Sequence, residues 1–434
     1  MVIFYTKQVT FRILYITRFI FTELLGIEVK VTDNKDEYQS SPFIKINYSI
    51  ESLDGISVFP KALLYETILA WVNPAYKIYK GLPVLFWTDQ EADIPFDIFA
   101  ASFFMISRYE EYLPQPLDMH GRVNAEDSVA YQHSFLHIPV VDHWSNLLKN
   151  EIIKRYPGTL FPSRVFTYIP TIDVDIAFAY LYRNLTRFTG ATLKSIVKGD
   201  FEDNLRRFRT ILSRERDPFD TYDLASELFD EFDLQPVFFF LLGRYGKFDR
   251  NIPVNSEEFQ QLIRKINQKY AVGIHPSYRS NEERHRLKLE IGQLEKITNR
   301  TVIRSRQHFL KMKMPETYQL LVSAGITEDY SMGYPSQAGF RAGTCTPFHF
   351  YDLSAESETS LLVYPFQVMD GTLNHYLGLT PAEAVVVIFR LIEEVKKVKG
   401  TFISVWHNES LSEIREWKSW REVYYQLTRA ACGN

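Results

Sequence analysis

The chain has 434 residues, of which 46% are hydrophobic and 24% are charged, and its formal net charge is -4. This length and apolar content are ample for two hydrophobic cores, so we expect two domains. The charge balance excludes a global basic field and therefore extended nucleic-acid binding. Only Cys345 and Cys432 are present, and their separation excludes a disulfide framework and a cysteine-based zinc site.

Residues 1–160 are predicted to form a smaller α+β accessory domain. Residues 1–27 are apolar, but Lys7, Arg12, Arg18 and Glu23 interrupt the apolar runs and no small-residue cleavage site follows. This pattern favours a buried amphipathic helix over a signal sequence. No uninterrupted apolar run reaches the roughly 18 to 20 residues that a transmembrane helix needs. We therefore expect a cytoplasmic protein without a transmembrane segment.

Further along this region, residues 96–112 have the pattern of a mostly buried helix that ends in a charged turn. The region also contains four histidines whose spacing matches no common metal motif, so structural roles are expected for them. These are His120, His133, His137 and His143. Residues 156–162, rich in proline and glycine, mark the boundary to the second domain.

Residues 161–434 are predicted to alternate between strands and helices. The strand candidates are residues 164–175, 236–242, 270–275, 301–306, 325–328 and 401–406. The helix candidates are residues 221–232, 256–269, 281–297, 314–324 and 381–399. Such alternation predicts parallel strands with helices outside them, which is typical of a (β/α) barrel whose functional groups lie at the carboxyl ends of the strands.

A basic insertion at residues 183–216 interrupts this alternation after the first strand. Its basic residues are Arg183, Arg187, Lys194, Lys198, Arg206, Arg207, Arg209, Arg214 and Arg216. Such a segment can meet an anionic glycan or a membrane surface. A solvated helical face is the simpler interpretation, because acidic residues are interleaved with the basic ones.

Polar residues close several of the predicted strands. Asp173 and Asp175 lie two apart at the end of the first strand, so both carboxylates should face one side. Two such carboxylates repel each other, so one must be protonated or a metal must bind. A turn in which one of them caps a helix is the alternative. His275 closes a predicted strand, and His308 and His407 follow two others. Each histidine has two possible roles, a structural one inside its domain and a functional one in the site.

The series of motifs over residues 164–410 resembles the polysaccharide deacetylase family, with its nodulation-deacetylase homology domain. The matching strings, in chain order, are Thr-Ile-Asp-Val-Asp, Phe-Phe-Phe-Leu-Leu-Gly, Gly-Ile-His-Pro-Ser, Gly-Ile-Thr-Glu-Asp-Tyr and Val-Trp-His. Residues 1–160 resemble the extra N-terminal region of a divergent bacterial branch, through Arg-Tyr-Glu-Glu-Tyr and His-Gly-Arg. The resemblance implies a distorted (β/α) barrel and a divalent metal, commonly zinc, used to hydrolyse acetyl groups on glycans or glycan precursors.

By this resemblance Asp173 is the catalytic base, Asp175 is the metal carboxylate and His407 is the general acid. The family has adjacent aspartates, whereas Val174 separates them here, so the two aspartate roles are exchangeable. The arginine that orients the base corresponds to Arg304 or Arg306, with Arg306 the preferred candidate.

The metal site implied by the resemblance needs an aspartate and two histidines. His275 matches the first histidine, but Arg279 and Ser280 stand where the second is usual. We expect His308 to replace it; otherwise the protein is a catalytically silent glycan-binding or assembly protein.

Two further residues match a less specific part of the family pattern, and a third is a candidate because of its glycine neighbours. Asp329 and Tyr330 take the place of a motif that lines the groove, or else cap a helix and fill the core. Arg341, which lies between Gly339 and Gly343, is expected to reach the pocket and bind substrate, with a surface salt bridge as the alternative.

Overall fold

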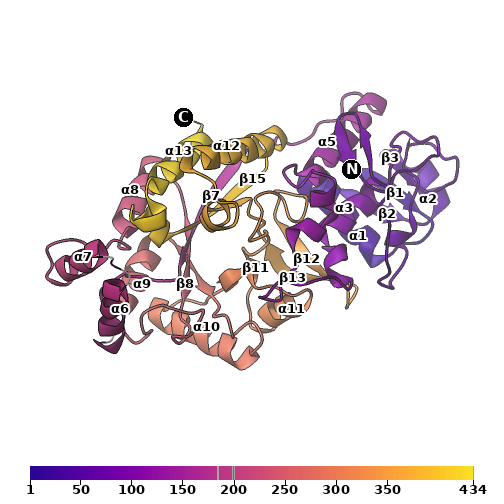
Figure 1. The fold of residues 1–434 in the computed structure, drawn as a ribbon. Helices are drawn as coiled ribbons and strands as arrows, with labels where there is room; N and C mark the ends of the chain where they lie inside the picture. The colour runs from indigo at the N-terminus through magenta and orange to yellow at the C-terminus, as the bar shows by residue number, and fades with distance from the viewer. Residues whose placement is uncertain (183–184, 198, 200, 434) are drawn as a thin grey trace.

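A computed structural model describes residues 1–182, 185–197, 199 and 201–433. The protein is a mixed α/β structure built around two sheets, a small one in the N-terminal region and a large one in the rest of the chain (Figure 1). Most buried apolar side chains of both regions belong to one continuous cluster that runs from Val2 to Ala431.

The N-terminal sheet has four strands in the order β2-β1-β3-β4, and all of its pairs are parallel. The strands are β1 (Val2–Thr6), β2 (Val29–Thr32), β3 (Ile44–Tyr48) and β4 (Ile56–Ser57). The helices around it are α1 (Phe11–Arg18), α2 (Lys35–Ser40), α3 (Ile98–Ile106), α4 (Val129–Gln132) and α5 (Val140–Arg155), and a hairpin of β5 (Lys77–Tyr79) and β6 (Leu82–Val84) lies between α2 and α3. Because the strands are parallel, this region is α/β, and the α+β prediction was wrong in that respect.

The prediction of one helix over residues 1–27 was also wrong. The run Val-Ile-Phe-Tyr-Thr forms the buried strand β1, as expected of β-branched and aromatic residues. Helix α1 begins only after Thr10, whose side chain accepts a hydrogen bond from the Ile13 N–H, and it continues into a π-helical turn at Phe19–Leu24. The predicted buried helix within residues 96–112 corresponds to α3, in which every residue is buried.

The large sheet has nine strands in the order β12-β13-β11-β10-β9-β8-β7-β15-β14. The strands are β7 (Thr167–Val174), β8 (Val237–Leu241), β9 (Ala271–His275), β10 (Arg304–Ser305), β11 (Glu328–Asp329), β12 (Phe348–Asp352), β13 (Ser357–Val363), β14 (Val368–Met369) and β15 (Thr401–His407). All pairs are parallel except β12 with β13. Within the described residues no pair joins β12 to β14, so the sheet is open and the predicted barrel is not closed.

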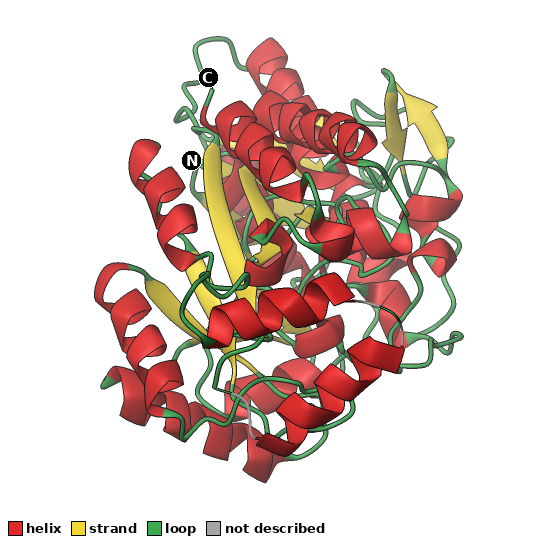
Figure 2. Ribbon diagram, turned by 60° about the vertical axis from the view of Figure 1, so that its left-hand side comes forward, coloured by secondary structure: helices red, strands yellow, loops and turns green. Residues whose placement is uncertain are grey.

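Helices separate the parallel strands and cover the sheet, as the alternating pattern predicted (Figure 2). They are α8 (Tyr222–Glu231), α9 (Glu257–Lys269), α10 (Arg284–Thr298), α11 (Glu316–Ser323), α12 (Pro381–Val398) and α13 (Trp420–Cys432). Helix α12 begins with a capping box between Thr380 and Glu383. Among the described residues, no helix combines the length and the apolar character that crossing a membrane would require.

The predicted basic insertion forms two helices, α6 (Leu185–Val197) and α7 (Phe201–Ile211). Arg183 and Lys198 lie outside the described residues, and so do the side chains of Arg187 and Lys194. The two helices lie on the opposite side of the molecule from the N-terminal region (Figure 1).

Candidate metal and acid–base site

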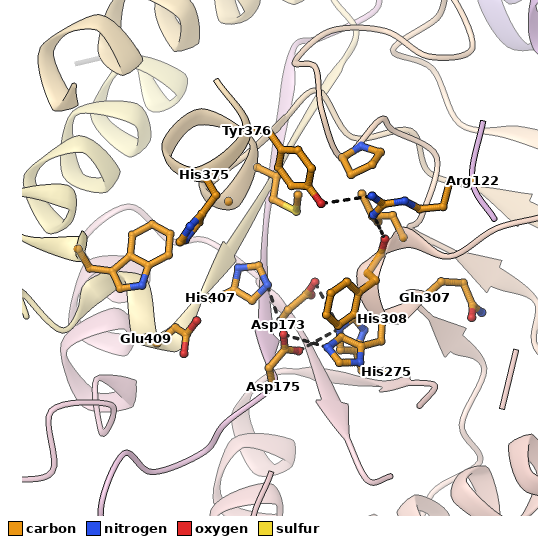
Figure 3. Close-up of a pocket in the computed structure, with 16 residues that line it drawn as sticks. Arg122, Asp173, Asp175, His275, Gln307, His308, His375, Tyr376, His407 and Glu409 are labelled. Atoms are coloured by element: carbon orange, nitrogen blue, oxygen red, sulfur yellow. Dashed lines mark hydrogen bonds and ion pairs between the residues drawn. The ribbon is translucent and has the colours of Figure 1, made fainter. Parts of the chain in front are cut away.

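A pocket of about 430 Å³ lies at the carboxyl ends of the central strands. Parallel pairing brings these ends together, because His407 of β15 is opposite Asp173 of β7 and Leu241 of β8 is opposite His275 of β9. The lining residues are Arg122, Asp173, Asp175, His275, Gln307, His308, Phe309, Leu310, Pro335, Met369, Gly371, His375, Tyr376, His407, Glu409 and Trp417 (Figure 3). The pocket is therefore concave and mostly apolar, with a cluster of ionisable groups on one wall.

Asp175, His275 and His308 converge on one point of this wall (Figure 3). His275 Nε2 is 3.1 Å from Asp175 Oδ1, and His308 Nε2 is 3.2 Å from Asp175 Oδ2. One ligand atom from each of the three residues lies within 4.8 Å of the others. One carboxylate and two imidazoles with an adjoining cavity are a donor set that suits Zn²⁺ with an open position.

Hydrogen bonds at the far side of each imidazole fix the direction of its Nε2 atom. His275 Nδ1 lies 2.5 Å from the Arg306 carbonyl oxygen, to which it can only donate. His308 Nδ1 lies 3.0 Å from Asp249 Oδ1. A histidine that donates from Nδ1 presents the lone pair of Nε2, which is the form that binds a metal. Both rings are thus oriented as metal ligands.

The charges of these groups also favour a cation. Burial alone would raise the pKa of Asp175, but His308 and His275 outweigh it and hold that pKa well below the usual value. Burial alone would lower the pKa of His308, but Asp175 and Asp249 raise it to about 9. The Asp175 carboxylate therefore stabilises a positive charge beside it, which a proton on His308 or a bound cation can supply. Within the described residues, Asp173 Oδ1 and Asp175 Oδ1 are buried without a hydrogen-bond partner.

Asp173 lies beside this cluster and next to a buried arginine. Arg306 Nε is 3.4 Å from Asp173 Oδ1, while Asp173 Oδ2 is 3.9 Å from His275 Nε2. The Arg306 guanidinium lies between the rings of Phe239 and Phe366, at 5.0 and 5.4 Å, and donates to Thr171 Oγ1. A buried guanidinium at this position places a positive charge beside the Asp173 carboxylate.

His407 approaches from the other side and is held by Asp370. Its Nδ1 is 2.8 Å from Asp370 Oδ1, and its backbone N–H donates to Asp370 Oδ2. Burial alone would lower the pKa of His407, but the Asp370 carboxylate overrides burial and raises that pKa well above the usual value. His407 Nε2 is 3.8 Å from Asp175 Oδ2, so a protonated imidazole faces the ligand cluster across the pocket.

The N-terminal region contributes Arg122 to the pocket. Its guanidinium donates to the Phe309 carbonyl oxygen at 2.5 Å and to the Tyr376 hydroxyl at 3.3 Å, and it pairs with Asp118 (Figure 3). His120 packs its ring against Phe309 at 5.1 Å. The string His-Gly-Arg at residues 120–122 therefore contacts the turn that carries His308.

Arg304, Asp329 and Tyr330, which the family pattern suggested, do not line the pocket. Arg304 pairs with Glu328 instead of Asp173. Asp329 is buried and accepts a hydrogen bond from Ser305, and Tyr330 stacks on Tyr364, so neither lines the groove.

Arg341 does not reach the pocket either, which corrects the expectation that it binds substrate. Its guanidinium is buried against Glu111, with bonds of 2.9 and 2.7 Å. Gly339 and Gly343 are closely packed rather than flexible, because an added Cβ would lie 2.4 Å from the Leu136 carbonyl and 2.9 Å from Met105. The loop is locked against the N-terminal region.

Sequence reasoning missed Asp249, Asp370, Glu409 and Arg122. Asp370 follows a two-residue strand, too short to be recognised from a pattern. Glu409 lies two residues beyond His407, and burial raises the pKa of its carboxyl to about 7, helped by Asp175 and Asp370. Arg122 belongs to the His-Gly-Arg string, to which no role was assigned, and Asp249 comes from a loop without a local signal.

Residues 2–157 match the model of DUF7033, a family of unknown function. No curated protein matches the sequence. Solved structures that resemble the chain include a Mycobacterium smegmatis protein described as a polysaccharide deacetylase, with 14% identity and a TM-score of 0.41 over 63% of this chain and 87% of that one.

Two other similar structures come from Bacillus species. The polysaccharide deacetylase of Bacillus cereus has 13% identity and a TM-score of 0.28 over 61% of this chain and 86% of that one. A pseudoenzyme of the CE4 family from Bacillus anthracis has 12% identity and a TM-score of 0.28 over 61% of this chain and 66% of that one. TM-scores this low do not establish a shared fold, so function has to be argued from the site.

Proposed function

We propose that this protein is a metal-dependent hydrolase that removes acetyl groups from a bacterial glycan or glycan precursor. The observation that carries the proposal is the convergence, in one pocket, of the Asp175, His275 and His308 donors with Asp173 and His407. The acetyl group and the glycan are inferred from the resemblance of the motif series to polysaccharide deacetylases.

In this proposal Asp175, His275 and His308 hold the cation, and Zn²⁺ suits their one oxygen and two nitrogen donors best. A cation in such an open site polarises a carbonyl oxygen and lowers the pKa of water to about 7. His308 replaces the histidine that the family pattern has at residues 279–280. The hydrogen bond between Asp249 and His308 Nδ1 supports this assignment, because metal-binding histidines are commonly oriented by a carboxylate.

The chain's own acid and base then move the proton. Asp173, which lies beside the Arg306 guanidinium, accepts a proton from the attacking water. His407, kept protonated by Asp370, donates a proton to the departing nitrogen or oxygen of the glycan. The two groups lie on adjacent strands β7 and β15, so both reach a substrate bound at the ligand cluster.

The first test measures metal content and deacetylation together. The purified protein should hold close to one equivalent of zinc or another divalent metal and should release acetate from N-acetylated glycan oligomers. Metal content should fall in His308→Ala, whereas His285→Ala, a change of an exposed histidine on α10, should leave it unchanged.

The acid and base roles are tested separately, because their loss should leave the metal in place. Asp173→Asn and His407→Ala should each lower the rate of acetate release by about 100-fold to 10,000-fold at unchanged metal content. A protein that takes up no zinc would instead support the silent glycan-binding alternative. A protein that binds zinc but keeps full activity in both variants would refute the assigned acid and base.

A further inference from the structure

Helix α7 has its polar side buried and its apolar side exposed. Asp203, Asn204, Arg207 and Thr210 are buried, at the spacing of one helical face. Phe201 and Leu205 of α7, and Leu212 directly after its last residue, are exposed by 71%, 51% and 62%. A helix on the surface of a water-soluble domain normally has the reverse arrangement. The exposed apolar face of α7 therefore lacks the cover that such a face normally receives.

Polar contacts hold α7 in this orientation. Asp203 accepts hydrogen bonds from the Tyr180 hydroxyl at 2.6 Å and from Arg207 Nη2 at 2.8 Å, and it also pairs with Arg415. The Arg207 guanidinium lies 5.3 Å from the centre of the Tyr180 ring. Rotating α7 to bury its apolar face would break the hydrogen bonds and ion pairs of Asp203 and Arg207. The loss of these bonds opposes the rotation.

Helix α6 packs against α7 and also has exposed apolar side chains. Two of the contacts between them are polar, with Ser195 Oγ 3.2 Å from Asp203 Oδ2 and Arg207 Nη1 3.3 Å from Thr192 Oγ1. Leu193, Ile196 and Val197 of α6 are exposed by 63%, 50% and 80%. Among the described side chains, both helices therefore expose apolar groups.

The segment also differs in charge from the rest of the chain. Residues 183–216 contain nine basic and four acidic residues, a net charge of +5, in a chain whose total is -4. The basic residues are those of the predicted basic insertion, and the acidic ones are Asp200, Glu202, Asp203 and Glu215. Cationic and exposed apolar side chains on short helices are the combination found in elements that lie in the interface of an anionic membrane.

We propose that α6 and α7 form a docking element that inserts its apolar side chains into the surface of an anionic phospholipid membrane. The lipid headgroups neutralise the positive charge while the acyl region takes up the residues that water now surrounds. A second copy of the chain is the poorer occupant, because it would bring one segment of charge +5 against another. An interfacial helix lies parallel to the membrane and does not need the length of a spanning one.

The docking element leaves the large sheet at the end that carries the pocket. The insertion follows Asp175 in the chain, and Arg415, the partner of Asp203, is two residues from the pocket residue Trp417. Docking would therefore bring the pocket end of the sheet toward the membrane. The proposal does not depend on the hydrolytic activity, since it rests on the surface of α6 and α7 alone.

Flotation with lipid vesicles tests the proposal on the full-length protein. Wild-type protein should float with vesicles of phosphatidylcholine and phosphatidylglycerol, bind much less to pure phosphatidylcholine, and dissociate as salt is raised. In the variant Phe201→Ser/Leu205→Ser/Leu212→Ser, binding to the anionic vesicles should fall by at least about tenfold.

A matched control replaces three exposed apolar residues elsewhere, Ile68→Ser/Leu160→Ser/Val165→Ser, and should bind like wild type. Circular dichroism and thermal melting check that both triple variants are folded. Absence of wild-type binding to anionic vesicles, or equal binding by the α7 variant, would overturn the proposal. The proposal would also fail if the wild-type protein were a dimer that binds no vesicles and the α7 variant were a monomer. The occupant of the apolar face would then be a second copy of the chain.

Discussion

At the residue level, His308 reaches the site from a turn with an unfavourable backbone. Phe309 and Leu310, the two residues after it, have positive φ angles of 59° and 50°. Non-glycine residues in this region cost of order 1 kcal/mol or more each unless surrounding contacts impose the conformation. Arg122 supplies such a contact, because it donates to the Phe309 carbonyl and is itself buried. The N-terminal region therefore helps to place a ligand of the proposed metal site.

Replacing Arg122 should weaken metal binding without removing a ligand. In Arg122→Ala the turn loses its clamp and His308 samples other directions, so we expect about 10-fold to 100-fold lower zinc affinity, the usual effect of removing a residue that orients a ligand. Competition with a chelator of known affinity measures this, and excess zinc should restore activity.

Two further variants separate this positioning effect from a general loss of stability. Arg122→Lys should keep the positive charge but recover only part of the affinity, since an ammonium group cannot replace a planar guanidinium with several donors. Arg264→Ala, which removes an exposed ion pair with Glu257 on α9, should bind zinc like wild type. An unchanged affinity in Arg122→Ala would mean that the turn holds its shape unaided.

At the level of elements, β9 depends on a glycine to present His275. A Cβ on Gly273 would lie 2.6 Å from the Phe239 ring and 2.9 Å from Arg304 Cβ, on the neighbouring strands β8 and β10. Phe239 in turn packs on the Arg306 guanidinium beside Asp173. Gly273 therefore allows the close strand packing on which the base and the first histidine ligand both rely.

Gly273→Ala should lower both stability and activity. Overpacking of this kind costs about 1 to 3 kcal/mol, so we expect a lower unfolding midpoint together with slower acetate release. Gly292→Ala is the matched control, because a Cβ there meets no heavy atom within 4 Å in the middle of α10. A helix-interior alanine should raise stability by about 0.5 to 1 kcal/mol. Two variants of equal stability would contradict the packing argument.

The elements also show how far the sequence predicts this structure. Long segments with a clear pattern, such as α9, α12, β7 and β15, are confirmed within a few residues. These helices bury one face and these strands are buried almost entirely, so the pattern of apolar residues is visible within each segment. The same strand ends place Asp173, Asp175, His275 and His407 in one pocket, where His308 Nε2 lies 3.2 Å from Asp175 Oδ2. The roles assigned to these residues stay predictions.

Features that depend on distant partners could not be predicted in this way. Strands β12 and β13 pair antiparallel at the sheet edge and pack against α1, for example through Tyr15, whose hydroxyl donates to the His349 carbonyl. Barrel closure likewise depends on whether the two edge strands meet, which no local pattern encodes. Arg341 was misassigned because its partner, Glu111, lies 230 positions away.

For the whole molecule, buried ion pairs join the N-terminal region to the large sheet. Glu111 lies between Arg341 and Arg108, and Arg108 also donates to the Tyr334 hydroxyl. Arg12 similarly pairs with Glu356. Together with the continuous apolar cluster, these pairs make the contact between the two regions resemble a domain interior. Loss of one partner should therefore destabilise both regions.

Glu111→Gln should lower the unfolding free energy by about 3 to 5 kcal/mol at pH 7, because it leaves the buried Arg341 without its carboxylate. Arg108 keeps its ion pair with Glu110. Burial alone would raise the pKa of Glu111, but Arg341 and Arg108 override it and lower that pKa to about 2. A lowered folded-state pKa stabilises the protein above the unfolded value of about 4.3, and this stabilisation disappears as pH falls toward 2.

The difference in melting temperature between wild type and Glu111→Gln should accordingly be largest at neutral pH and should shrink below about pH 4, as the wild-type carboxylate becomes protonated on unfolding. The other carboxylates titrate in both proteins, so their contribution to the pH dependence of stability cancels in the comparison. Glu358→Gln, which removes a partly exposed pair with Arg18, should change stability by no more than about 1 kcal/mol at any pH. If the gap between wild type and Glu111→Gln stays constant down to pH 3, the Glu111 carboxylate contributes packing rather than charge, and the contact between the regions is held by its apolar surface.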